Sequence, residues 1–289
     1  MSRENNKQNN LPDYKKLKKI TNKTILYLIL IAGVVITFFP FYYMMVLATR
    51  CRSEIFCYPP PLWFGNSAII NLNILLDKLP FFKNILNSII VSTLATLLVL
   101  FFCSLGGYGF AKYSFKNKEK LFFLMLASMM IPPLLSIIPW FIMMRVFGWI
   151  NSFKPLIIPG AANAFGIFLM RQFMEKIPNE IIDAARIDGA GEFEIYYKIA
   201  VPLSKPGLAT LSILTFLSSW NNFMGPLLIL QDKTMYTIPV ALSKLNGNFE
   251  TPWGATMMGT ALGVLPIVIV FIMASKRFIS GLTRGATKG

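Results

Sequence analysis

Six long stretches of this chain contain no Asp, Glu, Lys or Arg, and they restrict its fold more than any other feature. Five of them are 24 to 28 residues long, which lets a helix rising about 1.5 Å per residue cross a hydrocarbon core of roughly 30 Å. The fourth has only 16 residues, so it needs Gln172 to Met174 as an extension beyond Arg171, whose long side chain can reach the headgroups. With that extension the predicted spans cover residues 24–49, 84–111, 121–144, 155–174, 206–231 and 251–275.

The composition agrees with a membrane protein. Of the 289 residues, 55% are hydrophobic and only 14% are charged, which is more apolar than is usual for a soluble domain. We therefore expect an all-α polytopic protein in which residues 24–280 form one domain of six transmembrane helices surrounded by membrane lipid. Residues 1–23 are expected to be a cytoplasmic N-terminal segment, and residues 281–289 a cytoplasmic tail. Prolines inside the spans predict kinks at Pro132, Pro133, Pro139, Pro226 and Pro266.

The basic residues between the spans bear on both the number of spans and the orientation. If all six stretches cross the membrane, 20 of the 28 Lys and Arg residues lie on the side that holds both termini. If the short fourth stretch does not cross, the two sides hold 13 and 15, and the bias disappears. The positive-inside rule therefore favours six spans with both termini in the cytoplasm. The net charge of +15 does not indicate nucleic-acid binding, because the basic residues are spread over four cytoplasmic segments.

The residue types that are missing disfavour several classes of chemistry. The chain has no His, and no carboxylate lies inside the six stretches, which argues against a His-based active site and an intramembrane proton relay. No GxxxxGK[ST] sequence is present, so ATP is not expected to bind to this chain through a P-loop. We expect no enzyme active site, no metal site and no bound cofactor. Cys51 and Cys57 lie in the first external loop, where a disulfide between them is an open alternative to two free thiols.

The segment between the fourth and fifth spans, residues 178–206, is the densest mixture of charges in the chain. After Pro178, Asn179 is expected to be an N-cap, and Glu180 lies in the first turn, where the helix dipole favours an anion. Gly189 follows this short helix and can adopt the positive φ that ends a helix and turns the chain. The segment is therefore predicted to contain two short helices joined by a glycine.

The second of these helices has its own pattern. Its apolar members recur at i, i+3, i+4 and i+7 as Phe193, Tyr196, Tyr197 and Ala200. Glu194 and Lys198 form an i,i+4 pair in the favourable order. A charged loop between spans is most often only a solvated connector. The spacing of particular residues in this loop decides against that reading.

Those residues resemble the EAA loop in the permease subunits of ABC importers, in which Glu-Ala-Ala is followed by a glycine and then by Ile-x-Leu-Pro. The matching positions are Asp183, Ala184, Ala185, Gly189, Ile199, Ala200, Val201 and Pro202, with ten residues from the glycine to the isoleucine. Asp183 replaces Glu, and Val201 replaces Leu. The surrounding residues, the external segment 56–65 and the C-terminal end resemble the carbohydrate-uptake branch, so the resemblance covers nearly the whole chain.

The resemblance implies a permease of the bacterial plasma membrane that imports a sugar, oligosaccharide or related polyol. It implies a heterodimer with a second permease subunit, two ATP-binding subunits that hold the ATP, and an extracytoplasmic sugar-binding protein. It assigns coupling to the ATPase to Asp183, Ala184, Ala185, Asp188, Gly189, Ala190, Ile199 and Pro202. The tail residues implied to contact the ATPase pair are Gly281, Leu282, Thr283, Gly285 and Lys288. Candidates for the substrate pathway are Trp220, Asn221 and Asn222, which interhelical packing explains equally well.

Other classes of protein are kept as alternatives at this point. A permease for glycerol phosphate or another non-sugar solute would share the same architecture. A secondary transporter would need a coupling-ion site or inverted repeats, and the sequence has neither charge in the spans nor a clear repeat. A membrane scaffold without a transport role is the third alternative.

Overall fold

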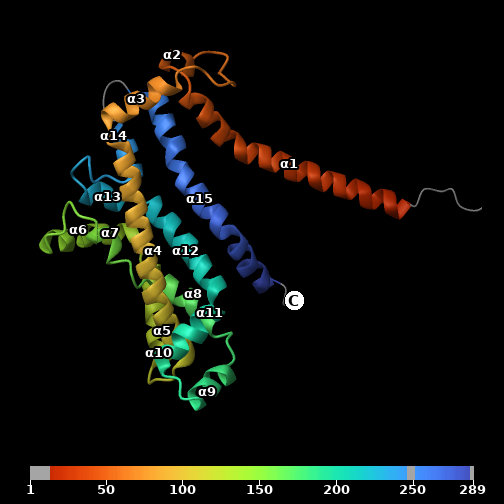
Figure 1. The fold of residues 1–289 in the computed structure, drawn as a ribbon, viewed down its shortest axis with the longest axis vertical. Helices are drawn as coiled ribbons and strands as arrows, with labels where there is room; N and C mark the ends of the chain where they lie inside the picture. The colour runs from red at the N-terminus through yellow and green to blue at the C-terminus, as the bar shows by residue number, and fades with distance from the viewer. Residues whose placement is uncertain (1–13, 246–250, 287–289) are drawn as a thin grey trace, which may run out of the picture.

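The computed structural model describes residues 14–245 and 251–286, with side chains over residues 22–245 and 251–272. In this part of the chain every regular element is helical, which confirms the all-α prediction (Figure 1). The bundle of the molecule consists of α4 (Phe81–Lys112), α8 (Ala164–Met174), α12 (Lys205–Trp220) and α15 (Trp253–Ala286). Within it α4 packs against both α8 and α12, and α15 packs against α12.

Three of the predicted spans are single long helices, namely α1 (Tyr14–Ala48), α4 and α15. The segments Asn22–Ala48, Phe81–Lys112 and Trp253–Ile272 are each long and apolar enough to cross a membrane. Pro266 lies inside α15 without interrupting it. These three helices therefore give the chain its membrane character by length and composition alone.

The stretch 121–144 is broken in the middle. Its first half is α5 (Lys118–Ala127) with a 3-10 turn, η1 (Ser128–Met130), and its second half is η2 (Pro133–Ser136) with α6 (Ile137–Val146). The two halves are bent by 89°. Pro132 and Pro133 cause the break, because proline has no N–H to donate and forces the residue before it out of the helical region. Pro132 accordingly has a ψ of 131°, so the predicted kink is a complete break.

The fourth and fifth stretches are interrupted as well. Residues 158–163 separate α7 (Lys154–Ile157) from α8, and residues 221–223 separate α12 from α13 (Met224–Ile229). A second bent pair joins Glu192–Leu203 to α12 at 78°, and counting each of the two bent pairs as one span gives up to five helices long enough to cross a membrane in the described chain, with α8 as a shorter apolar helix. Non-helical backbone at membrane depth is tolerated where it lines a cavity or is buried in protein. We therefore expect these interruptions to line a cavity or to be buried in the protein.

Close contact between α4 and α8 depends on small residues. A Cβ atom on Gly107 would lie 2.5 Å from the Cβ atom of Met170 and 2.8 Å from the backbone nitrogen of Arg171. On the facing helix, a Cβ atom on Gly166 would lie 2.6 Å from the sulfur of Cys103. Small residues at a crossing let two helix backbones approach closely. The buried side chains of one core cluster, among them Cys103 and Met170, lie around this crossing.

Arg171 does not reach outward as the sequence suggested. Its guanidinium donates to Glu175 at 2.7 Å and to Glu119 at 2.9 Å, and it lies 3.9 Å from the centroid of the Phe122 ring. The Arg171 side chain is only 11% exposed. The expectation that it reaches the headgroups is therefore wrong, because two carboxylates inside the chain already satisfy its charge.

The end of the bundle next to α2 (Arg52–Ile55) has a core of its own, to which α3 (Ala68–Lys78) and α14 (Ile238–Leu245) contribute. At the start of α4, the buried amides of Asn84 and Asn87 donate to carbonyl groups of residues 233–236 at 2.9 to 3.1 Å. Cys51 and Cys57 are free thiols in this structure.

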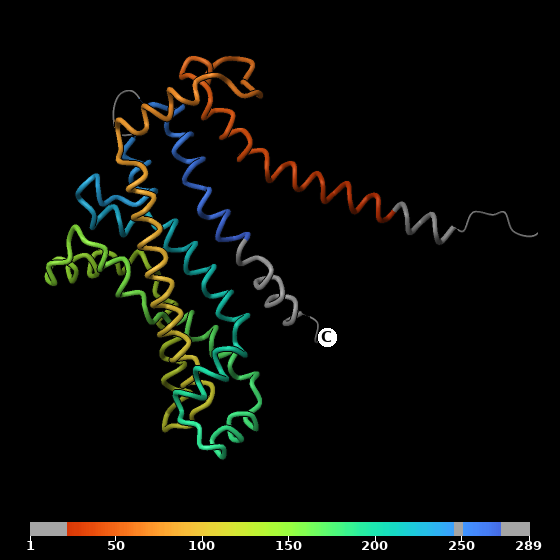
Figure 2. Tube along the Cα trace, in the orientation of Figure 1, coloured from red at the N-terminus to blue at the C-terminus, as the bar shows by residue number. Residues whose placement is uncertain are grey.

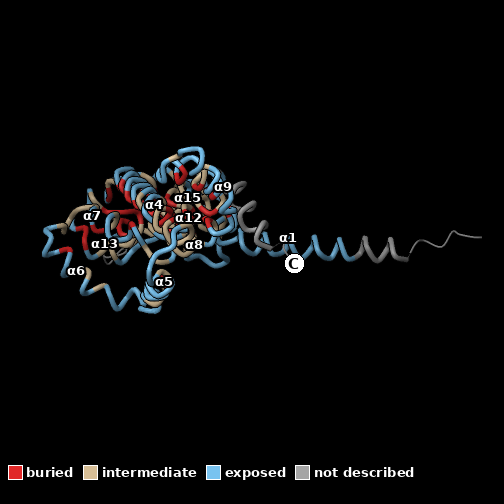
Figure 3. Tube along the Cα trace, turned by 90° about the horizontal axis from the view of Figure 1, so that it is seen from below, coloured by how far each residue is buried: buried red, intermediate tan, exposed pale blue. Residues whose placement is uncertain are grey.

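The first helix projects away from the rest of the molecule (Figures 1 and 2). Side chains 22–41 of α1 are exposed, whereas Val46, Leu47 and Ala48 at its C-terminal end are buried. Figure 3 shows α1 as an exposed rod beside the bundle. Its contacts are mainly with α15. This leaves a long apolar surface on α1 that the described residues do not cover.

Candidate functional site

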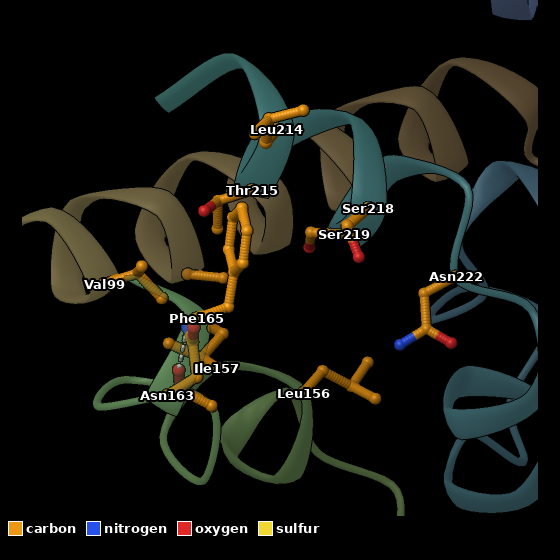
Figure 4. Close-up of a pocket in the computed structure, with 12 residues that line it drawn as sticks. Val99, Leu156, Ile157, Asn163, Phe165, Leu214, Thr215, Ser218, Ser219 and Asn222 are labelled. Carbon is orange, nitrogen blue, oxygen red and sulfur yellow. Dashed lines mark hydrogen bonds between the residues drawn. The ribbon is translucent and has the colours of Figure 1, made fainter. Parts of the chain in front are cut away.

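A cavity of about 510 Å³ lies where the interrupted fourth stretch meets α4 and α12 (Figure 4). Ala95 and Val99 from α4 form part of its wall. The segment from α7 through residues 158–163 to the start of α8 supplies a second part, and α12 supplies a third. The break between α7 and α8 thus borders the cavity.

The wall formed by α12 is polar. Thr215, Ser218, Ser219 and Asn222 line the cavity, and they follow one another at i, i+3, i+4 and i+7. Residues at this spacing lie on one side of a helix. Figure 4 shows Thr215, Ser218 and Ser219 on the side of α12 that faces Leu156, Phe165 and Asn163, with Asn222 on the loop just beyond the end of this helix. A row of hydroxyl and amide groups therefore faces a mainly apolar wall.

Asn163 is the polar member of that opposite wall. Its Oδ1 atom accepts a hydrogen bond from the backbone N–H of Gly166 at 2.7 Å and so caps the N-terminus of α8. Its Nδ2 atom points back to the carbonyl of Gly160, at 3.4 Å. Asn163 therefore holds the interrupted segment in place while it lines the cavity.

The chemistry of the cavity is neutral. Among the residues that line it in the described chain none carries a charge. Hydroxyl and amide groups can both donate and accept hydrogen bonds, and Leu156 and Phe165 offer apolar surface. Such a lining suits an uncharged ligand with many hydroxyl groups and apolar ring faces, whereas an anion would call for Arg or Lys. Among the described residues, no group of three or more His, Cys, Asp or Glu side chains is placed to hold a metal ion.

The three residues that the sequence suggested for a substrate pathway are separated by the structure. Trp220 is 3% exposed and stacks on Phe216 with 5.7 Å between the ring centroids, so it packs inside the bundle. Asn221 is exposed but does not line the cavity, and Asn222 does. The sequence analysis missed the hydroxyl residues of α12. Their helical spacing inside a charge-free stretch was the signal that could have identified them.

At the opposite end of the bundle from α2 and α3, residues 178–206 form a second candidate site, called here the 178–206 element (Figure 1). It contains α9 (Asn179–Ile187), α10 (Glu192–Ile195), a π-helical turn η3 (Tyr196–Ala200) and α11 (Val201–Leu203). Gly189 joins α9 to α10 and has a φ of 84°. A Cβ atom there would meet nothing within 4 Å, so the requirement for glycine is conformational and not steric.

The predicted coupling residues in the 178–206 element differ in their exposure to solvent. Asp183, Ala184, Asp188, Gly189 and Pro202 are exposed, whereas Ala185, Ala190 and Ile199 are half-buried. Ile182 is 2% exposed and anchors α9 in the same core cluster as Met170. Large apolar side chains also face outward from the element, namely Ile187, Phe193 and Leu203. The predicted tail residues Gly281, Leu282, Thr283 and Gly285 fall within α15, where only the backbone is described, and Lys288 lies outside the described residues.

Two local expectations for this element are wrong. Asn179 does not cap α9, since Pro178 occupies the N-cap position and the Asn179 side chain accepts a hydrogen bond from Lys112 at 2.9 Å instead. The apolar residues of the second helix do not share one face, because Tyr196 is buried while Tyr197 is exposed. The π-helical turn replaces the 3.6-residue period over these positions, and this shifts the faces. The expected i,i+4 pair is present, with 2.6 Å between Lys198 and Glu194.

Charged side chains hold the element together around Arg186. Its Nε and one terminal nitrogen donate to the two carboxylate oxygens of Glu192 at 2.8 and 3.3 Å, and the other terminal nitrogen donates to Asp183 at 3.0 Å. The Tyr113 hydroxyl donates to Glu192 at 2.6 Å. Hydrogen bonds from Arg186 and from Tyr113 lower the pKa of Glu192, and burial together with the bond to Glu192 raises the pKa of Tyr113 to about 12. Glu192 is therefore ionised and Tyr113 protonated near neutral pH.

Known proteins similar to this chain are transport permeases. The family model of the binding-protein-dependent transport system inner membrane component matches residues 103–283. The arabinooligosaccharides transport system permease protein of Bacillus subtilis (strain 168) is 38% identical over 209 residues, which are 72% of this chain and 74% of that protein. The lactose transport system permease protein of Rhizobium radiobacter is 30% identical over 256 residues, 89% of this chain and 93% of that protein. The sn-glycerol-3-phosphate transport system permease protein of Yersinia pestis is 30% identical over 264 residues, 89% and 94% of the two chains.

The fold is shared with a solved importer. A crystal structure of a bacterial ABC transporter involved in the import of the acidic polysaccharide alginate contains a chain that superimposes with a TM-score of 0.77 at 22% identity, covering 94% of this chain and 100% of that one. The family match confirms the resemblance that the 178–206 element suggested. The chain therefore belongs to the family of binding-protein-dependent transport system inner membrane components, the permease subunits of ABC importers.

Proposed function

We propose that this chain forms part of the pathway by which an ABC importer moves a neutral sugar, oligosaccharide or related polyol across a bacterial plasma membrane. The observation that carries the proposal is the charge-free cavity, with hydroxyl groups on α12 and the Asn222 amide just beyond its end facing apolar side chains. The names of the relatives for arabinooligosaccharides and lactose support the same substrate class.

The proposed topology has six crossings with both termini in the cytoplasm. Its support is the excess of Lys and Arg on the side that holds the termini, 20 of 28 residues. The long helices α1, α4 and α15 supply three crossings. The bent α5–α6 segment, the α7–α8 segment and the α12–α13 segment would supply the others. In this orientation the 178–206 element faces the cytoplasm.

We assign the 178–206 element to docking on a separate ATPase subunit. Exposed apolar side chains, Ile187 and Phe193 among them, flank the Gly189 turn at the tip of the bundle and suit an apolar cleft on a partner. ATP would be bound by two such partner subunits. Closure of the ATPase pair would then move the element as a rigid body and change which side of the membrane the cavity faces.

The uncovered face of α1 supports a second permease subunit, in a heterodimer, as a further partner. Side chains 22–41 are exposed along that face, although α1 also contacts α15. A partner helix and membrane lipid together would cover it. An extracytoplasmic binding protein would deliver the sugar at the end of the bundle that holds α2 and α3.

The test is reconstitution of the whole transporter in proteoliposomes, with the second permease, the ATPase subunits and the binding protein. ATP-dependent uptake is measured for lactose, an arabinooligosaccharide and sn-glycerol 3-phosphate at equal concentrations. We expect uptake of a neutral sugar, and we expect Asn222→Leu to reduce it several-fold by about 1 kcal/mol of lost hydrogen bonding. The neighbouring Asn221→Leu is the control, since Asn221 does not line the cavity.

A permease for glycerol phosphate is the second candidate, because one relative that covers 89% of this chain carries that name. The same uptake panel separates the two. Uptake of sn-glycerol 3-phosphate with none of either neutral sugar would overturn the proposed substrate class while leaving the importer assignment intact.

A further inference from the structure

The helix that lines the cavity reaches the 178–206 element at its C-terminal end, where Lys112 donates to Asn179 and the next residue, Tyr113, donates to Glu192. α4 contributes Ala95 and Val99 to the cavity wall, ends at Lys112, and is followed directly by Tyr113. The Tyr113 hydroxyl donates to Glu192 at 2.6 Å, across 79 positions of sequence. One continuous helix thus connects the cavity to the first residue of α10.

Glu192 also bonds to α9, through Arg186. Two nitrogens of Arg186 donate to the two oxygens of the Glu192 carboxylate. The third nitrogen donates to Asp183, which lies on the same helix as Arg186. A two-point contact between guanidinium and carboxylate fixes direction as well as distance. The bond crosses the Gly189 turn, where the backbone has its left-handed conformation. Arg186 therefore sets the angle between α9 and α10.

The rest of α9 is loosely attached. Ile182 is the one buried residue of this helix, and Ile187 at its end is 86% exposed. The Asn179 side chain at the start of α9 accepts a hydrogen bond from Lys112 at 2.9 Å, so the N-terminal half of the helix is attached to α4 while the other end is free to swing. The contact chain from Tyr113 through Glu192 to Arg186 attaches that other end and so fixes the orientation of α9.

Aromatic packing fixes the position of the Tyr113 ring. Its ring packs edge-on against Tyr108 at 5.7 Å, and Tyr108 packs against Tyr196 at 5.4 Å. The Tyr196 hydroxyl is hydrogen-bonded to Ser104 of α4 at 2.7 Å and is buried. The ring of Tyr113 is thus held from the α4 side, and its hydroxyl is the part that reaches the 178–206 element.

We infer that Tyr113 is a positioning residue for energy coupling: through Glu192 and Arg186 it fixes α9 relative to α4, so that movement of α9 is transmitted to the helix that lines the cavity. The inference rests on the proposed docking of the 178–206 element to an ATPase. Without the Tyr113 hydroxyl, the end of α9 that carries Arg186 is held to α4 less firmly and can swing about Ile182 and Asn179. ATP would then be hydrolysed with less solute moved.

The experiment compares wild type, Tyr113→Phe, Glu192→Gln and the double variant in the complete reconstituted transporter. Solute transported per ATP hydrolysed is the main readout, since a loss of folding alone would lower both rates and leave their ratio unchanged. We expect the ratio to fall about three- to tenfold in each single variant and no further in the double variant, because both residues act in the same chain of contacts from α4 to Arg186. Tyr58→Phe, which removes an exposed hydroxyl at the other end of the molecule, should leave the ratio unchanged.

Hydrogen exchange of the α9 amides in the assembled complex provides a second measurement. We expect faster exchange over residues 179–187 in Tyr113→Phe, with unchanged exchange in α4. A Tyr113→Phe transporter with the wild-type ratio and wild-type exchange would overturn the inference while leaving the proposed function standing. A wild-type chain that binds no ATPase subunit would overturn the proposed function and this inference with it. Additive losses in the double variant would also overturn it, since they would mean that the two residues act separately.

Discussion

The cavity and the 178–206 element differ in the kind of side chain that forms them, although α4 contacts both. Neutral hydroxyl and amide groups line the cavity, with no charge among them. The 178–206 element is organised by charge, with Arg186 between Asp183 and Glu192, and by one glycine in the left-handed region. A neutral lining can bind and release an uncharged solute without fixed counter-charges, whereas a force-transmitting part needs fixed angles. The comparison predicts that changes in the two regions should have separable effects on affinity and on coupling.

The largest effect is expected at the crossing of α4 and α8, because this packing supports both the cavity and the 178–206 element. In Gly107→Ala the new Cβ atom would lie 2.5 Å from that of Met170 and 2.8 Å from the backbone nitrogen of Arg171, so α4 and α8 must separate. We expect the free energy of unfolding to fall by about 1 to 3 kcal/mol, with loss of solute affinity and coupling together. Thermal unfolding of the purified permease complex measures this. Gly109→Ala, on the same helix with nothing within 4 Å of the new atom, should be close to neutral.

The next effect should be confined to coupling. Gly189→Val places a β-branched side chain at a φ of 84°, which costs roughly 1 to 3 kcal/mol of backbone strain. We expect membrane insertion to be intact, while ATPase stimulation by the loaded binding protein and solute uptake both fall at least about tenfold. Gly191→Val is the matched control, because Gly191 has a φ of −69° and open space around it. Normal uptake with normal ATPase stimulation in Gly189→Val would contradict the assignment of this element.

A smaller effect should be confined to the cavity. Ser219 lines the cavity and Ser212 does not, although both lie on α12 and both are half-buried. We expect Ser219→Ala to weaken the apparent affinity for the transported sugar about two- to tenfold through one lost hydrogen bond, with solute moved per ATP unchanged. Ser212→Ala should change neither quantity. A Ser219→Ala variant with altered coupling and unaltered affinity would break the distinction between the two regions.

The sequence predicted the 178–206 element better than the cavity. The element depends mainly on residues close together in the sequence, whereas the cavity depends on contacts between distant segments. The turn at Gly189 and the Glu194–Lys198 pair depend on neighbours within a few residues, and the structure has both. The side of α12 that faces the cavity depends on how α12 packs against α4, so Trp220 was chosen and Thr215 was missed. The break at Pro132 had a local cause, whereas the gap between α7 and α8 and the Tyr113–Glu192 contact arise from tertiary packing.

The smallest effect tests whether the contact from α4 to the 178–206 element depends on pH. The pKa of Tyr113 is raised to about 12 in the folded protein, above its ordinary value near 10. A group with a raised pKa contributes stability that is fully present below the unfolded pKa and is lost as the pH rises through the folded pKa. The difference in melting temperature between wild type and Tyr113→Phe should therefore be the same at pH 7 and pH 9, and it should shrink progressively between about pH 10 and about pH 12. A difference that already disappears by pH 9 would mean that the phenol titrates in that range and does not donate to Glu192, and α4 would then have no such contact with the 178–206 element.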